Sequence, residues 1–208
     1  MLIPDSYKLV GGYMDLDKKI GVLLTRAQVF TTAHLGLVQL ILEENDYACI
    51  VIGSADKCGT ERNPFDIKFR LSLLNVALSD FTDEDKNRII IFSLNDWLGE
   101  ENTDSLYQWG HYLYYNIVAN IDNKRFSFYY SDGEDILDKW FDGEVRPYIT
   151  YVCKNRNELF EEISATKVRE LLKKERFEQA KKYLPGREYL YMYDMSKRLN
   201  LISGSGCV

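Results

Sequence analysis

Three residues whose side chains suit phosphate chemistry stand at one turn of the sequence. Arg26, Thr31 and His34 follow directly on the apolar run at 19–24. If that run is a strand and a helix begins near His34, the turn lies where free backbone N–H groups and the helix dipole favour anions. Arg26 offers a planar fork for phosphate oxygens, and His34 could donate to a phosphoryl oxygen. A lone histidine at a helix start is more often a cap or a surface group, so His34 alone decides nothing.

The same turn lacks the two glycine-rich phosphate loops that are commonest in proteins. The sequence from Thr25 to Gly36 contains neither GxGxxG nor GxxxxGK[ST]. It is therefore neither a dinucleotide-binding fingerprint nor a P-loop.

Alternating apolar runs predict the elements that position this turn. Strands are expected at 19–24, 48–52, 88–94, 126–130 and 148–152. Helices are expected at 35–45, from Asn63-Pro64 to Leu78, at 106–121, and over most of 166–199. Nearly continuous apolar strands alternating with helices predict an α/β fold with a doubly wound parallel sheet. The turns at 25–34, 53–63 and 95–109 should then line one crevice at the carboxyl ends of the strands.

Composition narrows the class of protein. The 208 residues are 46% apolar with a net charge of −6, which argues against general nucleic-acid binding. We expect a 1–17 extension, one domain at 18–202 with C-terminal helices, and a flexible tail at 203–208. The four cysteines form no CxxC pair, and no apolar run approaches membrane-spanning length, so we expect a cytoplasmic protein without membrane association.

Three motifs in chain order carry a family resemblance. The stretch 26–34 resembles GRFQPFHxGH, and Thr31-Thr-Ala-His34 resembles the wider [HT]xGH motif. Gly53-Ser-Ala55, with Arg62-Asn-Pro-Phe65 and Arg70, is similar to GSA…NPFxxxxR, and 163–169 resembles ISSTxxR. The chain thus resembles the HxGH nucleotidylyltransferase superfamily, with archaeal-type nicotinamide-mononucleotide adenylyltransferases as its closest group. Three positions depart from the pattern, with Thr25 and Ala33 in place of glycines and Thr31 in place of the first histidine.

The resemblance implies a Rossmann-like fold and transfer of AMP from ATP, with Mg²⁺, to a pyridine mononucleotide. Implied catalytic residues are His34, Arg26 and Arg169. Implied ATP-binding residues are Thr25, Gln28, Thr31, Ser164 and Thr166, the last two also as the cap of a helix. Implied mononucleotide-binding residues are Ser54, Arg62, Asp96, Trp97 and Trp109, with Trp109 favoured as the stacking ring. We predict no protein ligand for the metal.

Several alternatives stay open. Another phosphorylated acceptor, or CTP as donor, would keep the superfamily and change the reaction. A non-catalytic nucleotide-binding descendant would explain Thr31 and Ala33. The residues do not decide between amide and acid mononucleotide. The expected partners are small-molecule substrates, and the tyrosine-rich segments 112–115 and 189–193 are candidates for a homo-oligomer interface or for core.

Overall fold

A five-stranded parallel sheet forms the centre of the computed structural model, which describes residues 17–96, 103–130, 136–154 and 164–204. The strand order is β3-β2-β1-β4-β5, and every neighbouring pair is parallel. The strands are β1 (Ile20–Thr25), β2 (Tyr47–Ile52), β3 (Ile89–Ser93), β4 (Phe126–Tyr130) and β5 (Ile149–Cys153). All five carboxyl ends therefore meet at one edge of the sheet, and the predicted doubly wound parallel sheet is confirmed.

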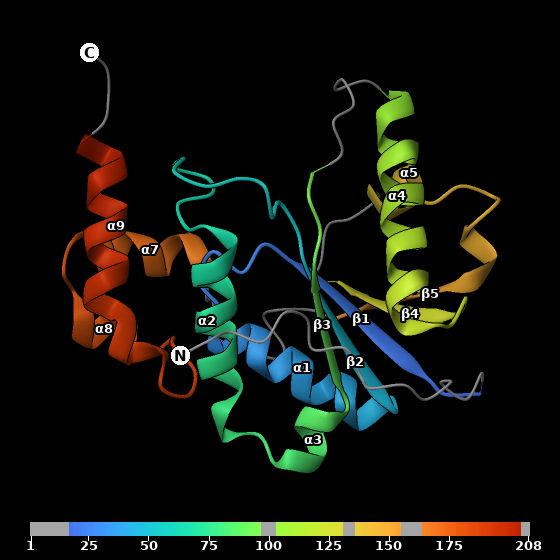
Figure 1. Cartoon of the computed structure of the whole chain (residues 1–208), viewed down its shortest axis with the longest axis horizontal. Coiled ribbons are helices and arrows are strands. Elements are labelled where there is room, and N and C mark those ends of the chain that lie inside the picture. The colour runs from blue at the N-terminus through green and yellow to red at the C-terminus, as the bar shows by residue number, and fades with distance from the viewer. Residues whose placement is uncertain (1–16, 97–102, 131–135, 155–163, 205–208) are drawn as a thin grey trace.

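Helices cover both faces of this sheet (Figure 1). On one face, α1 (Thr32–Glu44) and α2 (Ile67–Ala77) bury an apolar cluster against β1 and β2, followed by the short helices η1 (Leu78–Asp80) and α3 (Asp83–Asn87). On the other face, α4 (Thr103–Ile121) and α5 (Ile136–Trp140) pack over β1, β4 and β5, with η2 (Arg146–Tyr148) leading into β5. The central strands are apolar throughout because both of their faces are buried.

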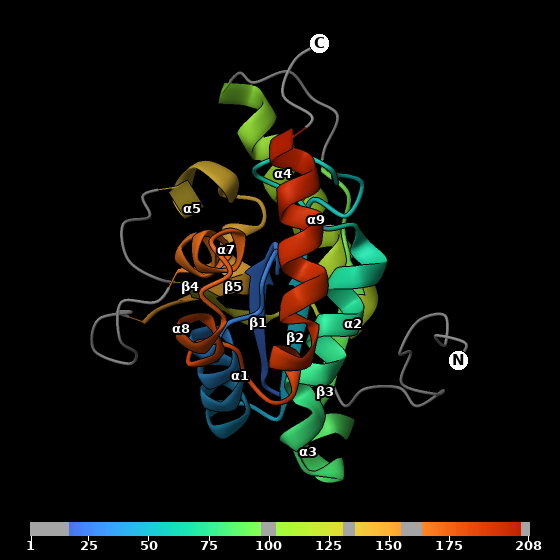
Figure 2. The same ribbon diagram turned by 90° about the vertical axis from the view of Figure 1, so that its left-hand side faces the viewer.

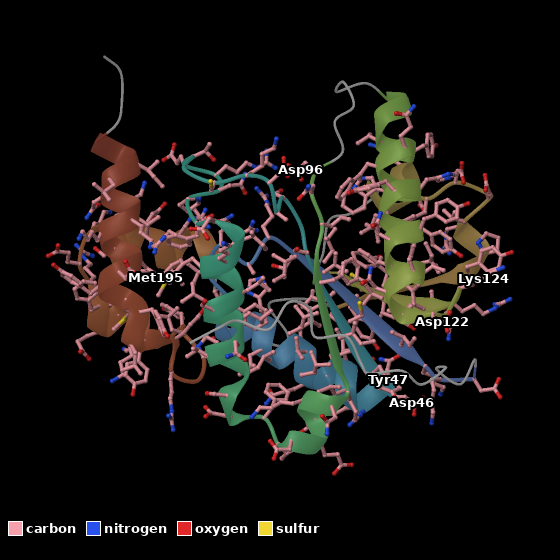
Figure 3. The ribbon with its side chains drawn as sticks, viewed as in Figure 1. Asp46, Tyr47, Asp96, Asp122, Lys124 and Met195 are labelled. Carbon is pink, nitrogen blue, oxygen red and sulfur yellow. The ribbon has the colours of Figure 1, made fainter. Side chains whose placement is uncertain are left out.

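The C-terminal helices form a third layer outside α2 (Figure 2). They are α7 (Ala165–Lys173), α8 (Phe177–Lys181), η3 (Glu188–Tyr191) and α9 (Met192–Gly204). Met195, on α9 in Figure 3, shares a buried cluster with Phe69 and Leu73 of α2 and with Val168 of α7. Helix α2 is therefore buried on two sides, and the start of α7 is brought to the carboxyl edge of the sheet.

Two predictions about helices are wrong in detail. The second helix begins at Ile67 rather than at Asn63-Pro64, because the side chain of Asp66 accepts from the Phe69 N–H at 2.9 Å and caps the helix there. The acidic run from Asp83 to Asp85, which lies outside the predicted helices and strands, forms the first turn of α3, where carboxylates interact favourably with the helix dipole.

The predicted extension at 1–17 and the predicted tail at 203–208 lie largely outside the described residues, which exclude 1–16 and 205–208. Helix α9 runs to Gly204, two residues into the predicted tail. Among the described helices, none combines the length and the apolar character needed to cross a membrane.

Candidate active site

The turn after β1 has a backbone that L-amino acids rarely adopt. Ala27 has φ of 46°, in the left-handed region where a Cβ atom is crowded. Its N–H donates to the Oγ1 of Thr25 at 3.1 Å, which closes the turn. The side chain of Arg26, one residue earlier, is exposed and lines a cleft at this edge of the sheet.

His34 lies in the first turn of α1, as predicted, and its ring is held by its neighbours. The N–H of Thr31, the N-cap residue, donates to His34 Nδ1 at 3.1 Å, and Thr31 Oγ1 lies 2.8 Å from the same nitrogen. Because a backbone N–H can only donate, Nδ1 accepts and the neutral ring carries its proton on Nε2. The ring also stacks on Phe30, with centroids 5.1 Å apart. His34 thus caps the helix and presents Nε2–H as its donor.

Ala33 stands next to His34, where the resembled motif has glycine. It belongs to the regular helix α1 and does not have a positive φ. The backbone at this position therefore does not require glycine, and the alanine is accommodated without backbone strain.

The turn after β2 is joined to the turn after β3. Ser54, with φ of 50°, donates from its Oγ to Asp96 Oδ1 at 2.8 Å. The Asp96 N–H in turn donates to Asp56 Oδ1 at 2.8 Å. Figure 3 shows Asp96 at the carboxyl edge of the sheet. These bonds fix the positions of Ser54 and Asp96 relative to each other.

Gln28 is buried and its amide bonds to the segment before α2. Its Oε1 accepts from the Phe65 N–H at 2.9 Å, and its Nε2 lies 3.4 Å from Asn63 Oδ1 and from Phe65 O. Gln28 therefore fixes the segment that carries Arg62. A contact between Gln28 and ATP phosphates stays a prediction.

Helix α7 begins at the cleft with a polar cap. Ser164 is its N-cap, and the Ser164 Oγ accepts from the Lys167 N–H at 3.1 Å. One turn on, an Nη atom of Arg169 donates to Thr166 Oγ1 at 3.2 Å. The predicted cap is confirmed, and the N-terminus of α7 adds a partial positive charge beside the Arg169 guanidinium.

Three arginines from three elements gather around the cleft. Partial burial lowers the pKa of Arg26, repulsion from Arg62 lowers it further, and Asp96 opposes the change. Burial and then repulsion from Arg26 likewise lower the pKa of Arg169. None of the three forms an ion pair with a carboxylate in the described part of the chain. An anionic ligand would relieve this repulsion.

Aromatic rings form the opposite wall of the cleft. Trp109 of α4 and Trp140 of α5 meet edge to face, with centroids 6.2 Å apart and planes at 85°. Phe128 of β4 lines the cleft beside them. Trp97, the other tryptophan predicted here, lies outside the described residues.

The cleft has a volume of about 820 Å³, and the structure brings to it every predicted site residue that it describes. These are Thr25, Arg26, Gln28, Thr31, His34, Ser54, Arg62, Asp96, Trp109, Ser164, Thr166 and Arg169. The volume falls within the range of small-molecule sites. Residues distant in sequence thus converge on one place of suitable size for a nucleotide.

The sequence reasoning missed cleft residues that follow the last two strands. Trp140 and Lys154 line the cleft, and the Lys154 Nζ lies 2.7 Å from Glu44 Oε1. The rule that selected the turns after the first three strands applies equally to the fourth and fifth. Applied there, it would have pointed to the segments that carry Trp140 and Lys154.

Comparison with known proteins relates the fold to mononucleotide adenylyltransferases. No protein-family model matches the sequence. A bifunctional NMN adenylyltransferase/ADP ribose pyrophosphatase from Francisella tularensis matches with a TM-score of 0.68 at 18% identity, over 89% of this chain and 53% of that one. Another structure of that bifunctional protein was crystallised with AMP and a manganese ion.

Two further structures show the same relationship. The nicotinic acid mononucleotide adenylyltransferase of Plasmodium falciparum matches with a TM-score of 0.56 at 16% identity, over 89% of this chain and 98% of that one. A NadR protein in complex with NR matches with a TM-score of 0.61 at 20% identity, over 84% of this chain and 45% of that one. The chain spans about half the length of the bifunctional protein and of NadR. At these identities the similarity establishes the nucleotidylyltransferase-like fold.

Proposed function

We propose that the protein is a mononucleotide adenylyltransferase that joins ATP to nicotinamide mononucleotide or nicotinic acid mononucleotide. The products would be NAD or its acid form, and pyrophosphate. The observation that carries the proposal is the convergence on one cleft, beside a tryptophan wall, of His34 and of three arginines that have no carboxylate partner among the described residues. The solved structures of similar fold, which include NMN and nicotinic acid mononucleotide adenylyltransferases, support it.

In the proposed reaction, a 5′-phosphate oxygen of the mononucleotide attacks the α-phosphorus of ATP in line. A new P–O bond forms while the bond from the α-phosphorus to the bridging oxygen breaks, and pyrophosphate leaves with that electron pair. No covalent bond to the protein is needed. The protein's task is to position the two phosphates and neutralise the charge that develops.

The donor side would use the residues nearest the two helix starts. His34 Nε2–H would donate to an α-phosphate oxygen as that oxygen gains charge. Arg26 and Arg169 would hold the phosphate chain and the leaving pyrophosphate. Ser164 and Thr166 would add to the polar start of α7. Thr31 already fixes the His34 tautomer through Nδ1, so the threonine in the motif keeps the ring suited to this role.

The acceptor side would use the turns after β2 and β3 and the tryptophan wall. Arg62 would bind the phosphate of the mononucleotide, and the Ser54–Asp96 pair would contact its sugar. Trp109 would stack on the pyridine ring. A flat ring with a phosphate suits an aromatic wall that faces a cluster of arginines.

Magnesium is expected to enter with ATP. When bound with ATP, it would supply positive charge that neutralises part of the charge on the phosphates. Among the described residues there is no group of three or more histidine, cysteine, aspartate or glutamate side chains that could hold a metal. Magnesium sites built on substrate phosphates need few protein carboxylates.

The test is an assay with ATP, Mg²⁺ and each mononucleotide, following dinucleotide and pyrophosphate together. The wild type should release both products in equal amounts. His34→Ala should lower kcat by about 10²- to 10³-fold, the usual effect of losing one donor to a developing charge, while ATP binding by calorimetry is largely retained.

The chain supplies a matched control in its second histidine. His111 lies on α4, pairs with Asp142 at 3.0 Å and is not among the residues that line the cleft. His111→Ala should leave kcat within about two-fold. Clear ATP binding with no product from either mononucleotide would contradict the proposal.

A further inference from the structure

A fully buried guanidinium lies beneath the two turns that carry Arg26 and Ser54. Arg70 of α2 is 0% exposed. Its Nη1 donates to the carbonyl of Arg26 at 2.8 Å and to that of Gly53 at 2.9 Å, and its Nη2 donates to the carbonyl of Ser54 at 2.8 Å. One side chain therefore ties the turn after β1 to the turn after β2.

Arginine is an unfavourable residue type at position 70 if the side chain only fills the core. Burial lowers the pKa of Arg70, partly opposed by the charges of Asp66, Asp56 and Asp96. Its Nε is buried without a hydrogen-bond partner among the described residues. A buried charge with incomplete hydrogen bonding is usually less stable than an apolar side chain of similar volume.

The carbonyls that Arg70 holds adjoin the two strained residues at the cleft. The carbonyls of Arg26 and Gly53 belong to the peptide groups that immediately precede Ala27 and Ser54, whose φ angles are 46° and 50°. Non-glycine residues persist in this region when the surrounding structure holds them there. The hydrogen bonds of Arg70 are positioned to do so at both turns.

We propose that Arg70 is a positioning residue that holds the left-handed turns at Ala27 and Ser54, so that Arg26 meets the phosphates of ATP and Ser54 meets the sugar of the mononucleotide at the cleft. It touches no substrate itself. This inference rests on the proposed adenylyl transfer for its effect on rate, and on phosphate binding at the cleft for a second, independent readout.

The chain contains a matched control at the other edge of the sheet. Arg88, beside β3, also donates to three backbone carbonyls, those of Asp46, Leu42 and Asn45. None of these three residues has a positive φ, and Arg88 does not line the cleft. Arg88→Lys removes a comparable set of hydrogen bonds without reaching the proposed site.

The experiment compares Arg70→Lys with Arg88→Lys. Lysine keeps the charge and cannot reproduce the planar fork. Both variants should fold, with similar falls in Tm. Arg70→Lys should lower kcat about 100-fold, as expected for a small misplacement of reacting groups, and the KM for ATP should change less than kcat. Arg88→Lys should keep both constants within about two-fold.

Inorganic pyrophosphate provides a readout that does not need turnover. Its Kd by calorimetry should rise at least ten-fold in Arg70→Lys and stay unchanged in Arg88→Lys. A wild type that makes no dinucleotide, with this binding difference present, would remove the proposed function and leave the positioning role. Equal rates and equal binding in the two variants would overturn the inference. So would failure of Arg70→Lys to fold while Arg88→Lys folds, because Arg70 would then serve the whole fold.

Discussion

At each of two edges of the sheet, one arginine donates hydrogen bonds to three backbone carbonyls, but the two arginines hold different kinds of structure. At the amino edge, near Asp46 and Tyr47 in Figure 3, Arg88 holds the end of α1 and lies 3.6 Å from Asp85. At the carboxyl edge, near Asp96, Arg70 holds two turns with left-handed residues and is completely buried.

The surrounding charges differ as well. At the amino edge the cations Lys18 and Arg88 face Asp46 and Asp85. At the carboxyl edge Arg26, Arg62 and Arg169 gather without ion pairs in the described part of the chain. The amino edge pairs these charges within the protein, whereas the carboxyl edge keeps three arginines without ion pairs among the described residues, and we propose that this positive charge binds a ligand. This contrast separates residues that build the fold from residues that build the site.

The largest expected effect comes from removing one of the cleft cations. Arg169→Ala should lower kcat/KM for ATP by about 100-fold or more, because a charge-assisted contact to transferring phosphates is lost. Lys167→Ala is the control, since Lys167 is exposed on the same helix and does not line the cleft. Steady-state kinetics with both variants measures the difference. Similar losses in the two would mean that general positive charge, and not the site, binds ATP.

A second prediction concerns a buried carboxyl group behind the site turn. Burial raises the pKa of Glu188 well above its ordinary 4.5, against a smaller opposing effect of the Phe30 backbone amide. The folded protein therefore binds a proton that the unfolded chain releases, and this group's contribution to stability falls as pH rises above 4.5. Glu188→Gln should raise Tm, by an amount that grows between pH 5 and pH 8.

Thermal unfolding of both proteins over that range checks the sign. A Tm difference that does not change with pH would show that Glu188 is ionised in the folded state.

The smallest expected effects on stability and rate come from replacing left-handed residues by glycine, both at the cleft and away from it. Glu175 follows Lys174, the C-cap of α7, and has φ of 52°. The N–H groups of Glu175 and Arg176 donate to the carbonyls of Leu172 and Leu171, the pattern that favours glycine at this position. Glu175→Gly should stabilise the protein by about 1 kcal/mol and leave kcat unchanged.

Ala27→Gly should give a similar gain in stability and a several-fold fall in kcat, because glycine relaxes the turn beside Arg26. Chemical denaturation and the dinucleotide assay measure the two quantities. Unchanged kcat in Ala27→Gly would show that the strain at the cleft serves no function.

Sequence patterns sufficed for the sheet because its strands are buried on both faces and read as continuous apolar runs. The strand at 126–130 was predicted to the residue. The start of α2 was not, because Asp66 competes with Pro64 as a helix start and only the cap geometry decides between them. The predicted strand ends also located the cleft, because the turns that follow parallel strands all lie at one edge of the sheet.

Sequence patterns could not predict the long-range hydrogen bonds that hold the turns around the cleft. Arg70 meets carbonyls that lie 44, 17 and 16 positions away, and no local pattern encodes that approach. Gln28 was assigned to ATP, and the structure shows its amide bonded to Phe65. Trp140 could have been found by following the fourth strand to its turn, as was done for the first three.

The most direct measurement follows the α-phosphorus of ATP. Wild-type protein is incubated with Mg²⁺, ATP labelled at that atom, and nicotinamide or nicotinic acid mononucleotide, and the labelled products are separated. We predict label in the dinucleotide, with pyrophosphate unlabelled, and label that appears about 10²- to 10³-fold more slowly with His34→Ala. Label in free AMP, or in no product despite ATP binding, would contradict adenylyl transfer to a mononucleotide.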